Sequence, residues 1–185
     1  ELLIVTQNVD NLHERGGAKR LLHMHGELGS AWCLACDARY PWQGAMHLKN
    51  TDNPELVEGL SFTSTPEKKG QGFDEFSPVG LRKSVACKKC GEPGHVRPDI
   101  VWFGEMPYRM DEIEAALARC DLFVSIGTSG AVYPAAGFVQ TARHHGAQTL
   151  EMNLDPSEGS VFFHESRMGK AGELVPVWVD EVLDA

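Results

Sequence analysis

The sequence lacks the features of nucleic-acid-binding, membrane-spanning and secreted proteins. It carries 17 Lys and Arg residues against 26 Asp and Glu residues, a net charge of −9, so it has no excess of basic side chains for a phosphate backbone. No apolar run approaches the length that spans a bilayer. The opening residues 1–4 contain neither the basic segment nor the cleavage site of a signal peptide. We therefore expect no nucleic-acid partner, no membrane partner and a cytoplasmic location.

Cysteine is scarce, but four of the five cysteines are paired by spacing. Two CxxC pairs, Cys33/Cys36 and Cys87/Cys90, predict a tetrahedral Cys₄ zinc site, because without a secretion signal such pairs favour a metal over disulfides. The gap between the pairs is wide, and a polar loop at 45–85 accounts for it. Four protein ligands leave no open coordination position, so this zinc is predicted to be structural. The alternative is two unrelated pairs of buried thiols, and the fifth cysteine, Cys120, is expected to pack in the core.

The pattern of apolar and helix-forming stretches predicts an α/β fold with a parallel sheet. Its two parts, 1–28 and 98–185, flank an inserted zinc-binding module with a long loop at 29–97. Buried strands are expected at 2–5, 122–126 and 149–153, the last two joined by a parallel crossover through a helix at 134–145. Further helices are expected at 18–22, at 111–118 with Asp111 as its cap, and at 176–183.

Polar groups follow the predicted strands, at the sheet edge where open α/β sheets bind ligands. Thr6, Gln7, Asn8 and Asp10 come directly after the first strand, and their amides and carboxylate suit a ribose and a carboxamide. The alternative is a capping turn. Gly127, Thr128 and Ser129 follow the strand at 122–126, and Asn153 ends the neighbouring strand, so we expect them side by side. A Gly-Thr-Ser tripeptide by itself would be only a turn.

One histidine is a candidate general base. His25 follows the polar cluster, and imidazole titrates near neutral pH. His23 lies two residues away and is the competing candidate.

These motifs together resemble those of the sirtuins, the NAD-dependent protein lysine deacylases, and most closely the bacterial class III branch. The resemblance covers nearly the whole chain except residues 45–85. It rests on TQNVDNLHERGG and HMHGEL at 6–28, CLAC at 33–36, CKKC at 87–90, RPDIVWFGE at 97–105, GTSGAVYPAA at 127–136 and NLD at 153–155. It implies a Rossmann-like NAD-binding domain with an inserted zinc module.

The resemblance also implies residue roles. His25, the histidine immediately before glycine, is the base, while Gln7, Asn8, Val9 and Asp10 surround the nicotinamide ribose and carboxamide. The adenosine half of NAD is assigned to Gly127, Thr128, Ser129, Asn153, Leu154, Asp155 and Ala171. An exposed strand formed by Val101, Trp102, Phe103, Gly104 and Glu105 would pair with the backbone of an acylated lysine peptide. The alternative for that stretch is an ordinary strand with Trp102 and Phe103 in the core.

The implied reaction removes an acyl group, acetyl or succinyl, from lysine and releases nicotinamide and O-acyl-ADP-ribose. Two alternatives stay open: transfer of ADP-ribose to protein, and a non-enzymatic zinc-ribbon binding module, which would not need the motifs at 6–10 and 25–26. The chain opens without Met at a predicted buried strand, and the family's glycine-rich loop, GIPxFR segment and Tyr-x-x-Arg pair are not in it. We therefore expect an incomplete N-terminus and an inactive chain when it is taken alone. The missing Tyr-x-x-Arg pair reads the acyl group in the family, so acyl preference, protein targets and oligomeric state stay open.

Overall fold

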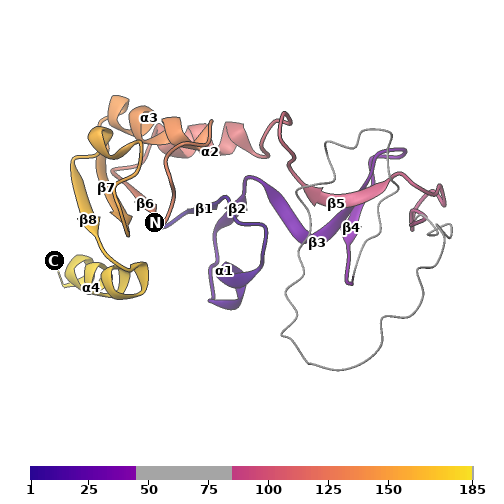
Figure 1. The fold of residues 1–185 in the computed structure, drawn as a ribbon, viewed down its shortest axis with the longest axis horizontal. Helices are drawn as coiled ribbons and strands as arrows, with labels where there is room; N and C mark the ends of the chain where they lie inside the picture. Colours follow the sequence, from indigo (N-terminus) through magenta and orange to yellow (C-terminus); the bar gives the residue numbers. More distant parts are fainter. Residues whose placement is uncertain (45–84, 185) are drawn as a thin grey trace, which may run out of the picture. The chain divides into compact units, whose positions relative to one another are not determined.

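The computed structural model describes residues 1–44 and 85–184, which form two compact units, Glu1–Tyr108 and Arg109–Ala185 (Figure 1). The loop predicted at 45–85 lies almost wholly outside the described residues. Each unit has its own sheets: a parallel pair and a three-stranded antiparallel sheet in the first, and a three-stranded parallel sheet in the second. The chain is therefore α/β, as the sequence predicts.

The first unit opens with two short parallel strands, β1 (Ile4–Thr6) and β2 (Leu21–His23), joined through helix α1 (Leu12–Arg15). The expected strand at 2–5 begins only at Ile4, and Leu2 is 73% exposed. The helix expected at 18–22 is wrong. Gly17, with a φ of 90°, follows the end of α1, and the segment after it pairs with β1, which gains more backbone hydrogen bonds than one isolated helical turn.

The rest of the first unit is an antiparallel sheet in the order β4-β3-β5. Its strands are β3 (Gly26–Cys33), β4 (Arg39–Pro41) and β5 (Val96–Ile100). A small core of Ala31, Cys33, Tyr40, Cys87 and Val96 packs on this sheet. The domain borders expected at 28/29 and 97/98 stay predictions, and β3 and β5 run across them.

The second unit is a parallel sheet in the order β6-β7-β8 (Figure 1). Strands β6 (Leu122–Ile126), β7 (Gln148–Asn153) and β8 (Glu165–Met168) alternate with helices. The helices are α2 (Met110–Leu117), α3 (Phe138–His144), α4 (Ala171–Leu183) and the 3-10 helices η2 (Ala135–Gly137) and η3 (Ser160–Phe162). The predicted strand–helix–strand crossover is confirmed, since β6 and β7 pair in parallel with α3 between them.

Three expectations for this unit need correction. Strand β6 is only partly buried, with 43% exposure at both Leu122 and Ile126, because among the described strands it has β7 as its one neighbour. Asp111 lies in the first turn of α2, and the cap position is occupied by Arg109 in the left-handed conformation. Helix α4 begins at Ala171 rather than near Pro176, because the carbonyl of Lys170 already accepts from Glu173 and Leu174.

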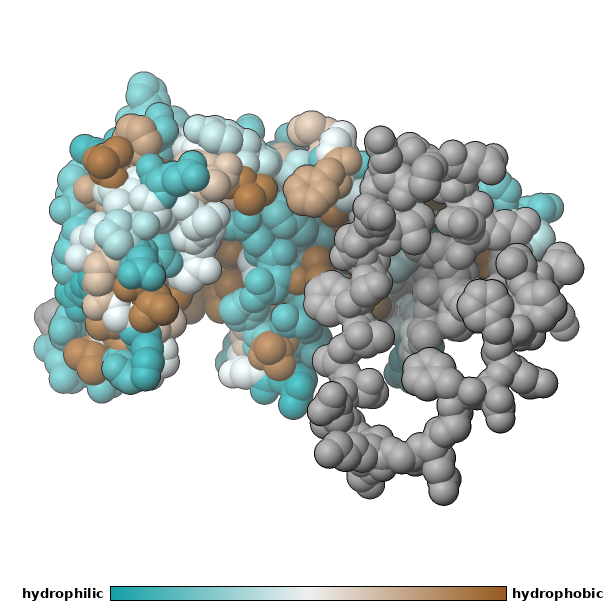
Figure 2. Space-filling model, viewed as in Figure 1, coloured by the Kyte–Doolittle hydropathy of each residue, from teal (hydrophilic) through white to brown (hydrophobic). Residues whose placement is uncertain are grey.

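The surface mixes polar and apolar side chains. Figure 2 shows hydrophobic residues scattered among hydrophilic ones on the face in view, and exposed apolar side chains include Leu2, Val161 and Leu183. Scattered exposed apolar residues are normal for folded proteins. None of the helices in the described parts of the chain has the length and apolarity needed to cross a membrane.

Candidate functional site

The four paired cysteines come together at one end of the antiparallel sheet. Sγ of Cys33 lies 3.8 Å from Sγ of Cys90, and Sγ of Cys36 lies 3.8 Å from Sγ of Cys87; all four sulfurs lie within 4.8 Å of one another. Zinc–sulfur bonds of about 2.3 Å in a tetrahedron place neighbouring sulfurs about 3.8 Å apart. The donor set therefore fits a zinc ion, and the alternative of two unrelated thiol pairs fails.

The environment of these thiols also suits a metal. Backbone N–H groups of Cys90 and Lys89 donate to Cys87 and lower the pKa of its thiol to about 6, and thiolates are the form that binds zinc. The fifth cysteine takes no part. Cys120 is half-buried rather than in the core, its Sγ donates to the carbonyl of Leu117 at 3.4 Å, and burial raises its pKa.

The polar stretch after β1 has local hydrogen bonds of its own. The backbone N–H of Asn8 donates to Oγ1 of the buried Thr6 at 3.1 Å, and Oδ1 of Asp10 accepts from the backbone N–H of Leu12 at 2.9 Å. Asp10 thus closes the turn that starts α1, so the capping alternative holds for this carboxylate. The cofactor contacts of Gln7, Asn8, Val9 and Asp10 stay predictions.

His25 is held by its Nδ1 atom, which lies 3.2 Å from the backbone carbonyl of Gln7. A carbonyl can only accept, so Nδ1 is the donor in this contact, and in the neutral ring the lone pair is on Nε2. The carbonyl of His25 accepts from the backbone N–H of Val101 at 2.9 Å, which ties this residue to the segment after β5. A histidine in this tautomer can take a proton at Nε2.

The glycine after His25 is required by close packing of backbones. Gly26 has a φ of +79°, and a Cβ added there would lie 2.1 Å from the carbonyl oxygen of Asp99 on β5. Only glycine avoids both the left-handed strain and this collision. The His-Gly pair thus lets β3 approach β5 directly beside the imidazole.

His23 differs from His25 because both of its ring nitrogens face acceptors. Nδ1 lies 3.0 Å from the carbonyl of Asn8, and Nε2 lies 2.8 Å from Oε1 of Glu14 and 3.7 Å from Oε1 of Glu27. Burial alone would lower the pKa of His23, but its contacts with Glu14 and Asn8 raise it above the ordinary value. Both ring nitrogens of His23 thus face acceptors, which favours its protonated form. This difference favours the prediction that His25 is the base.

The segment 101–105 is a turn and not the expected strand. Strand β5 ends at Ile100, and the N–H of Glu105 donates to the carbonyl of Trp102 at 3.0 Å around Gly104, whose φ is +87°. Phe103 is fully exposed, so the alternative that places it in the core is also wrong. The Glu105 carboxylate fixes the turn by binding the Arg97 guanidinium and the backbone N–H of Trp102. A peptide contact at 101–105 stays a prediction.

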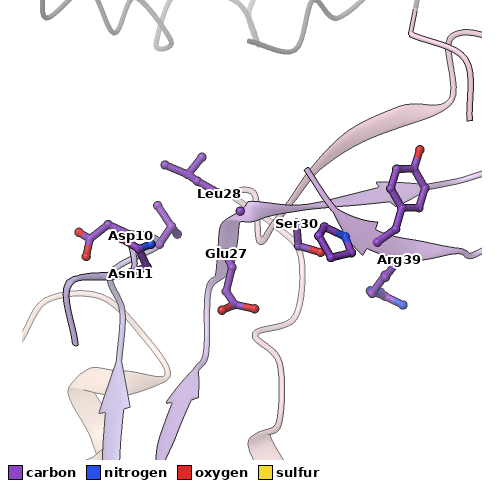
Figure 3. A pocket seen from close by; sticks show the side chains of 10 residues that line it. Asp10, Asn11, Glu27, Leu28, Ser30 and Arg39 are labelled. Carbon is purple, nitrogen blue, oxygen red and sulfur yellow. The ribbon is translucent and has the colours of Figure 1, made fainter. Parts of the chain in front are cut away.

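A cavity of about 690 Å³ in the first unit contains two of the predicted residues, Val9 and Asp10 (Figure 3). It is lined by 9–11, 27–30 and 39–41. Asp10 and Asn11 lie on one side of it and Arg39 on the other (Figure 3). Asp99 holds Arg39 in place and also accepts from Ser30 and Tyr108, at 3.3, 3.2 and 2.9 Å respectively.

In the second unit, the ends of β6 and β7 lie side by side, as the sequence predicts. The backbone N–H of Gly127 donates to the carbonyl of Met152 at 3.0 Å, and Nδ2 of Asn153 donates to the carbonyl of Thr128 at 2.8 Å. The remaining predicted residues of this unit are Ser129, the exposed Leu154 and Asp155, and Ala171 at the start of α4. Sequence reasoning missed Glu151, a buried carboxylate that binds Asn153. Its position between Leu150 and Met152 in a predicted buried strand was the available signal.

Comparison with known proteins gives one consistent answer. The model of the Sir2 family matches residues 1–134. The chain is 47% identical to an "NAD-dependent protein deacylase SIR2rp3" of Leishmania major over 183 residues, 99% of this chain and 61% of the relative. It is 47% identical to an "NAD-dependent protein deacylase" of Vibrio cholerae over 182 residues, 98% of this chain and 60% of the relative. The chain thus spans about three fifths of the length of the curated relatives it matches.

Solved structures agree on the fold. A Sir2 homologue–NAD complex superposes with a TM-score of 0.74 at 28% identity, covering 99% of this chain and 59% of that one. A structure of Sir2Af2 bound to a myristoylated histone peptide has a TM-score of 0.66 at 31% identity, covering 97% of this chain and 64% of that one. With the family match over most of its residues and these relatives, the chain belongs to the Sir2 family.

Proposed function

We propose that the protein is an NAD-dependent protein lysine deacylase. The observation that carries this proposal is His25, whose Nδ1 is tied to the carbonyl of Gln7 and whose Nε2 is left as a base, directly beside the TQNVD stretch. The names of the relatives, NAD-dependent protein deacylases, support it. The substrates are acylated lysine peptides or proteins, by analogy with the relative solved with a myristoylated histone peptide. The location that we propose is the cytoplasm.

The chain's residues take these roles in the proposal. NAD supplies the ADP-ribosyl group that accepts the acyl group while nicotinamide leaves. His25 removes a proton from a ribose hydroxyl through Nε2, so that the oxygen can attack the acyl carbon. The nicotinamide half of NAD is contacted by Gln7, Asn8, Val9 and Asp10. The adenosine half is contacted by Gly127–Ser129, Asn153–Asp155 and Ala171. The turn at 101–105 contacts the peptide.

Zinc has a structural role in this proposal. The thiolates of Cys33, Cys36, Cys87 and Cys90 fill the four positions of a tetrahedral ion, so no position is open for a substrate. The ion would hold the turns that carry the two CxxC pairs, in the module proposed at 29–97. The Rossmann-like domain would comprise 1–28 and 98–185.

Product analysis of the full-length protein tests the proposal. With NAD and an acetyl-lysine peptide, we expect nicotinamide, deacylated peptide and O-acetyl-ADP-ribose in equal amounts by mass spectrometry. ADP-ribose attached to protein, without loss of acetyl groups, would instead establish ADP-ribosyl transfer. Absence of both products with zinc-loaded, folded protein would leave only a binding module.

A further inference from the structure

The parallel sheet of the second unit contains a fully buried carboxylate. Glu151 lies on the central strand β7 with 0% exposure. Its Oε1 accepts from Nδ2 of Asn153 at 2.9 Å, and its Oε2 accepts from Oγ of Ser160 at 2.5 Å and from Oγ of Ser166 at 3.1 Å. These donors come from β7, η3 and β8 and are all neutral. Burial of a carboxylate is costly, so an apolar residue would serve better here if the position only filled the core.

The donors around both oxygens of Glu151 favour its ionised form. Burial raises the pKa of Glu151, but hydrogen bonds from Ser157, Ser160, Ser166 and Asn153 outweigh it, and the pKa lies below the ordinary value. An ionised carboxylate can only accept hydrogen bonds. It therefore dictates which atom of a neighbouring amide must face it.

That neighbour is Asn153, whose two N–H groups are both committed. One donates to the carbonyl of Thr128 at 2.8 Å and the other to Glu151 at 2.9 Å. The opposite orientation of the amide would set its oxygen against two acceptors. Oδ1 is thus the polar atom that Asn153 has left to offer.

We infer that Glu151 is a positioning residue that fixes the Asn153 amide and so makes Asn153 an acceptor for a ligand hydroxyl. The inference rests on the proposed function, which supplies a ligand with ribose hydroxyls. A ligand carbonyl or phosphate oxygen at the same place would meet Oδ1 as a second acceptor and be rejected. Glu151 thereby contributes to specificity without touching the ligand.

The positioning role of Glu151 can be tested in the full-length protein by binding measurements. The ligands are ADP-ribose and analogues that lack one hydroxyl of the adenosine ribose. In the wild type, we expect loss of the hydroxyl that meets Asn153 to weaken binding about tenfold or more. In Glu151→Leu, ADP-ribose binding should weaken by a similar factor. The hydroxyl penalty, which is the loss of affinity when the ligand lacks that hydroxyl, should disappear. Glu151→Gln keeps it, because its carbonyl oxygen can still face Asn153 while the serine hydroxyls turn to accept. Glu165→Gln, an exposed carboxylate change on β8, is the matched control and leaves both affinity and penalty unchanged.

A full hydroxyl penalty in Glu151→Leu would overturn the inference. If that variant does not fold, Asn153→Asp, which sets two carboxylates in contact, replaces it. Adding Glu151→Gln to Asn153→Asp removes the contact between the two carboxylates and should recover part of the lost ADP-ribose affinity, because an aspartate oxygen still faces the Thr128 carbonyl. An affinity no higher than that of Asn153→Asp alone overturns the inference.

The exchange rate of the Asn153 side-chain amide protons, measured by NMR without ligand, separates the two proposals. Slow exchange in the wild type and in Glu151→Gln, but fast exchange in Glu151→Leu, supports the positioning role even if ADP-ribose does not bind. In that case the proposed function alone fails. Exchange that is unchanged by Glu151→Leu overturns the positioning role itself.

Discussion

At the scale of single residues, His23 and His25 differ in what their ring nitrogens contact. His25 has one nitrogen on the carbonyl of Gln7, whereas His23 bridges the carbonyl of Asn8 and the carboxylate of Glu14. The imidazole thus faces one acceptor at His25 and acceptors at both ring nitrogens at the half-buried His23. The difference comes from the number of acceptors around each ring.

Replacement of His25 by alanine in the full-length protein should suppress turnover about 10²–10⁴-fold, the usual contribution of a general base. ADP-ribose binding should change little, because no predicted cofactor side chain is removed. Deacylation rate and calorimetry measure the two effects. Near-normal turnover of His25→Ala together with a large loss in His23→Ala would show that His23 is the base.

His23 should make stability depend on pH in a defined direction. The pKa of His23 is raised in the folded state above its ordinary value of 6.5. Its contribution to the free energy of unfolding is therefore complete below pH 6.5 and is lost as the pH rises through the pKa of the folded state. The difference in melting temperature between wild type and His23→Gln should therefore be larger at about pH 5.5 than at about pH 8.5. A difference for His23→Gln that grows with pH would contradict this.

At the scale of elements, the antiparallel sheet depends on two contacts made at its ends. The start of β3 lies against β5 at Gly26, and the end of β3 carries Cys33 of the zinc cluster. Both contacts join segments far apart in the sequence. Each can be tested by a single substitution with a neighbouring control.

Gly26→Ala should lower the free energy of unfolding by about 2–4 kcal/mol, the sum of backbone strain and overpacking against Asp99. Urea denaturation measures this. Gly29→Ala on the same strand is the control, because an added Cβ meets nothing within 4 Å and φ is not left-handed there. Equal stabilities of the two variants would show that β3 and β5 can separate without cost.

Cys87→Ser should reduce the zinc content from one ion per chain to well below one, since three thiolates and a hydroxyl are a poorer donor set. Metal analysis of the undenatured protein measures it. Cys120→Ser should keep one ion, because Cys120 lies outside the cluster. Zinc-free wild-type protein, or equal zinc loss in both variants, would refute the assignment.

At the scale of the whole molecule, the chain divides into units with different sources of stability. The unit Glu1–Tyr108 has small sheets and the cysteine cluster, whereas Arg109–Ala185 has a parallel sheet with a buried central strand. Small domains with little core often depend on a metal. The two units should therefore respond differently to removal of zinc.

Hydrogen exchange with and without a zinc chelator measures that response. The chelator should abolish protection of the backbone amides in β3 and β5 and leave those of β6 and β7 protected, because the cluster lies in the first unit only. Protection of β3 and β5 is lost because binding of the metal is coupled to folding of this unit. Simultaneous loss of protection in both sheets would mean that the chain unfolds as one cooperative body.

The sequence by itself determined the features that depend on local pattern or fixed spacing. The CxxC pairs identified all four clustered thiols, and apolar runs located β6 and β7 within one residue. The family followed from the same short motifs. These predictions succeed because neighbouring residues encode the features concerned. The features are the spacing within each CxxC pair, the hydrophobicity of the strands and the order of strand, helix and strand.

Only the tertiary structure decided features that depend on partners distant in the chain. Residues 21–23 form a strand and not a helix because β1 lies beside them, and 101–105 turn because Arg97 and Glu105 close the loop. The resemblance already predicts His25 rather than His23 as the base, but only the structure shows which acceptors surround each ring. The hydrogen bonds of His23 to Glu14 and of His25 to Gln7 join residues 9 and 18 positions apart. Such contacts leave no periodicity in a sequence, so only the folded chain reveals them.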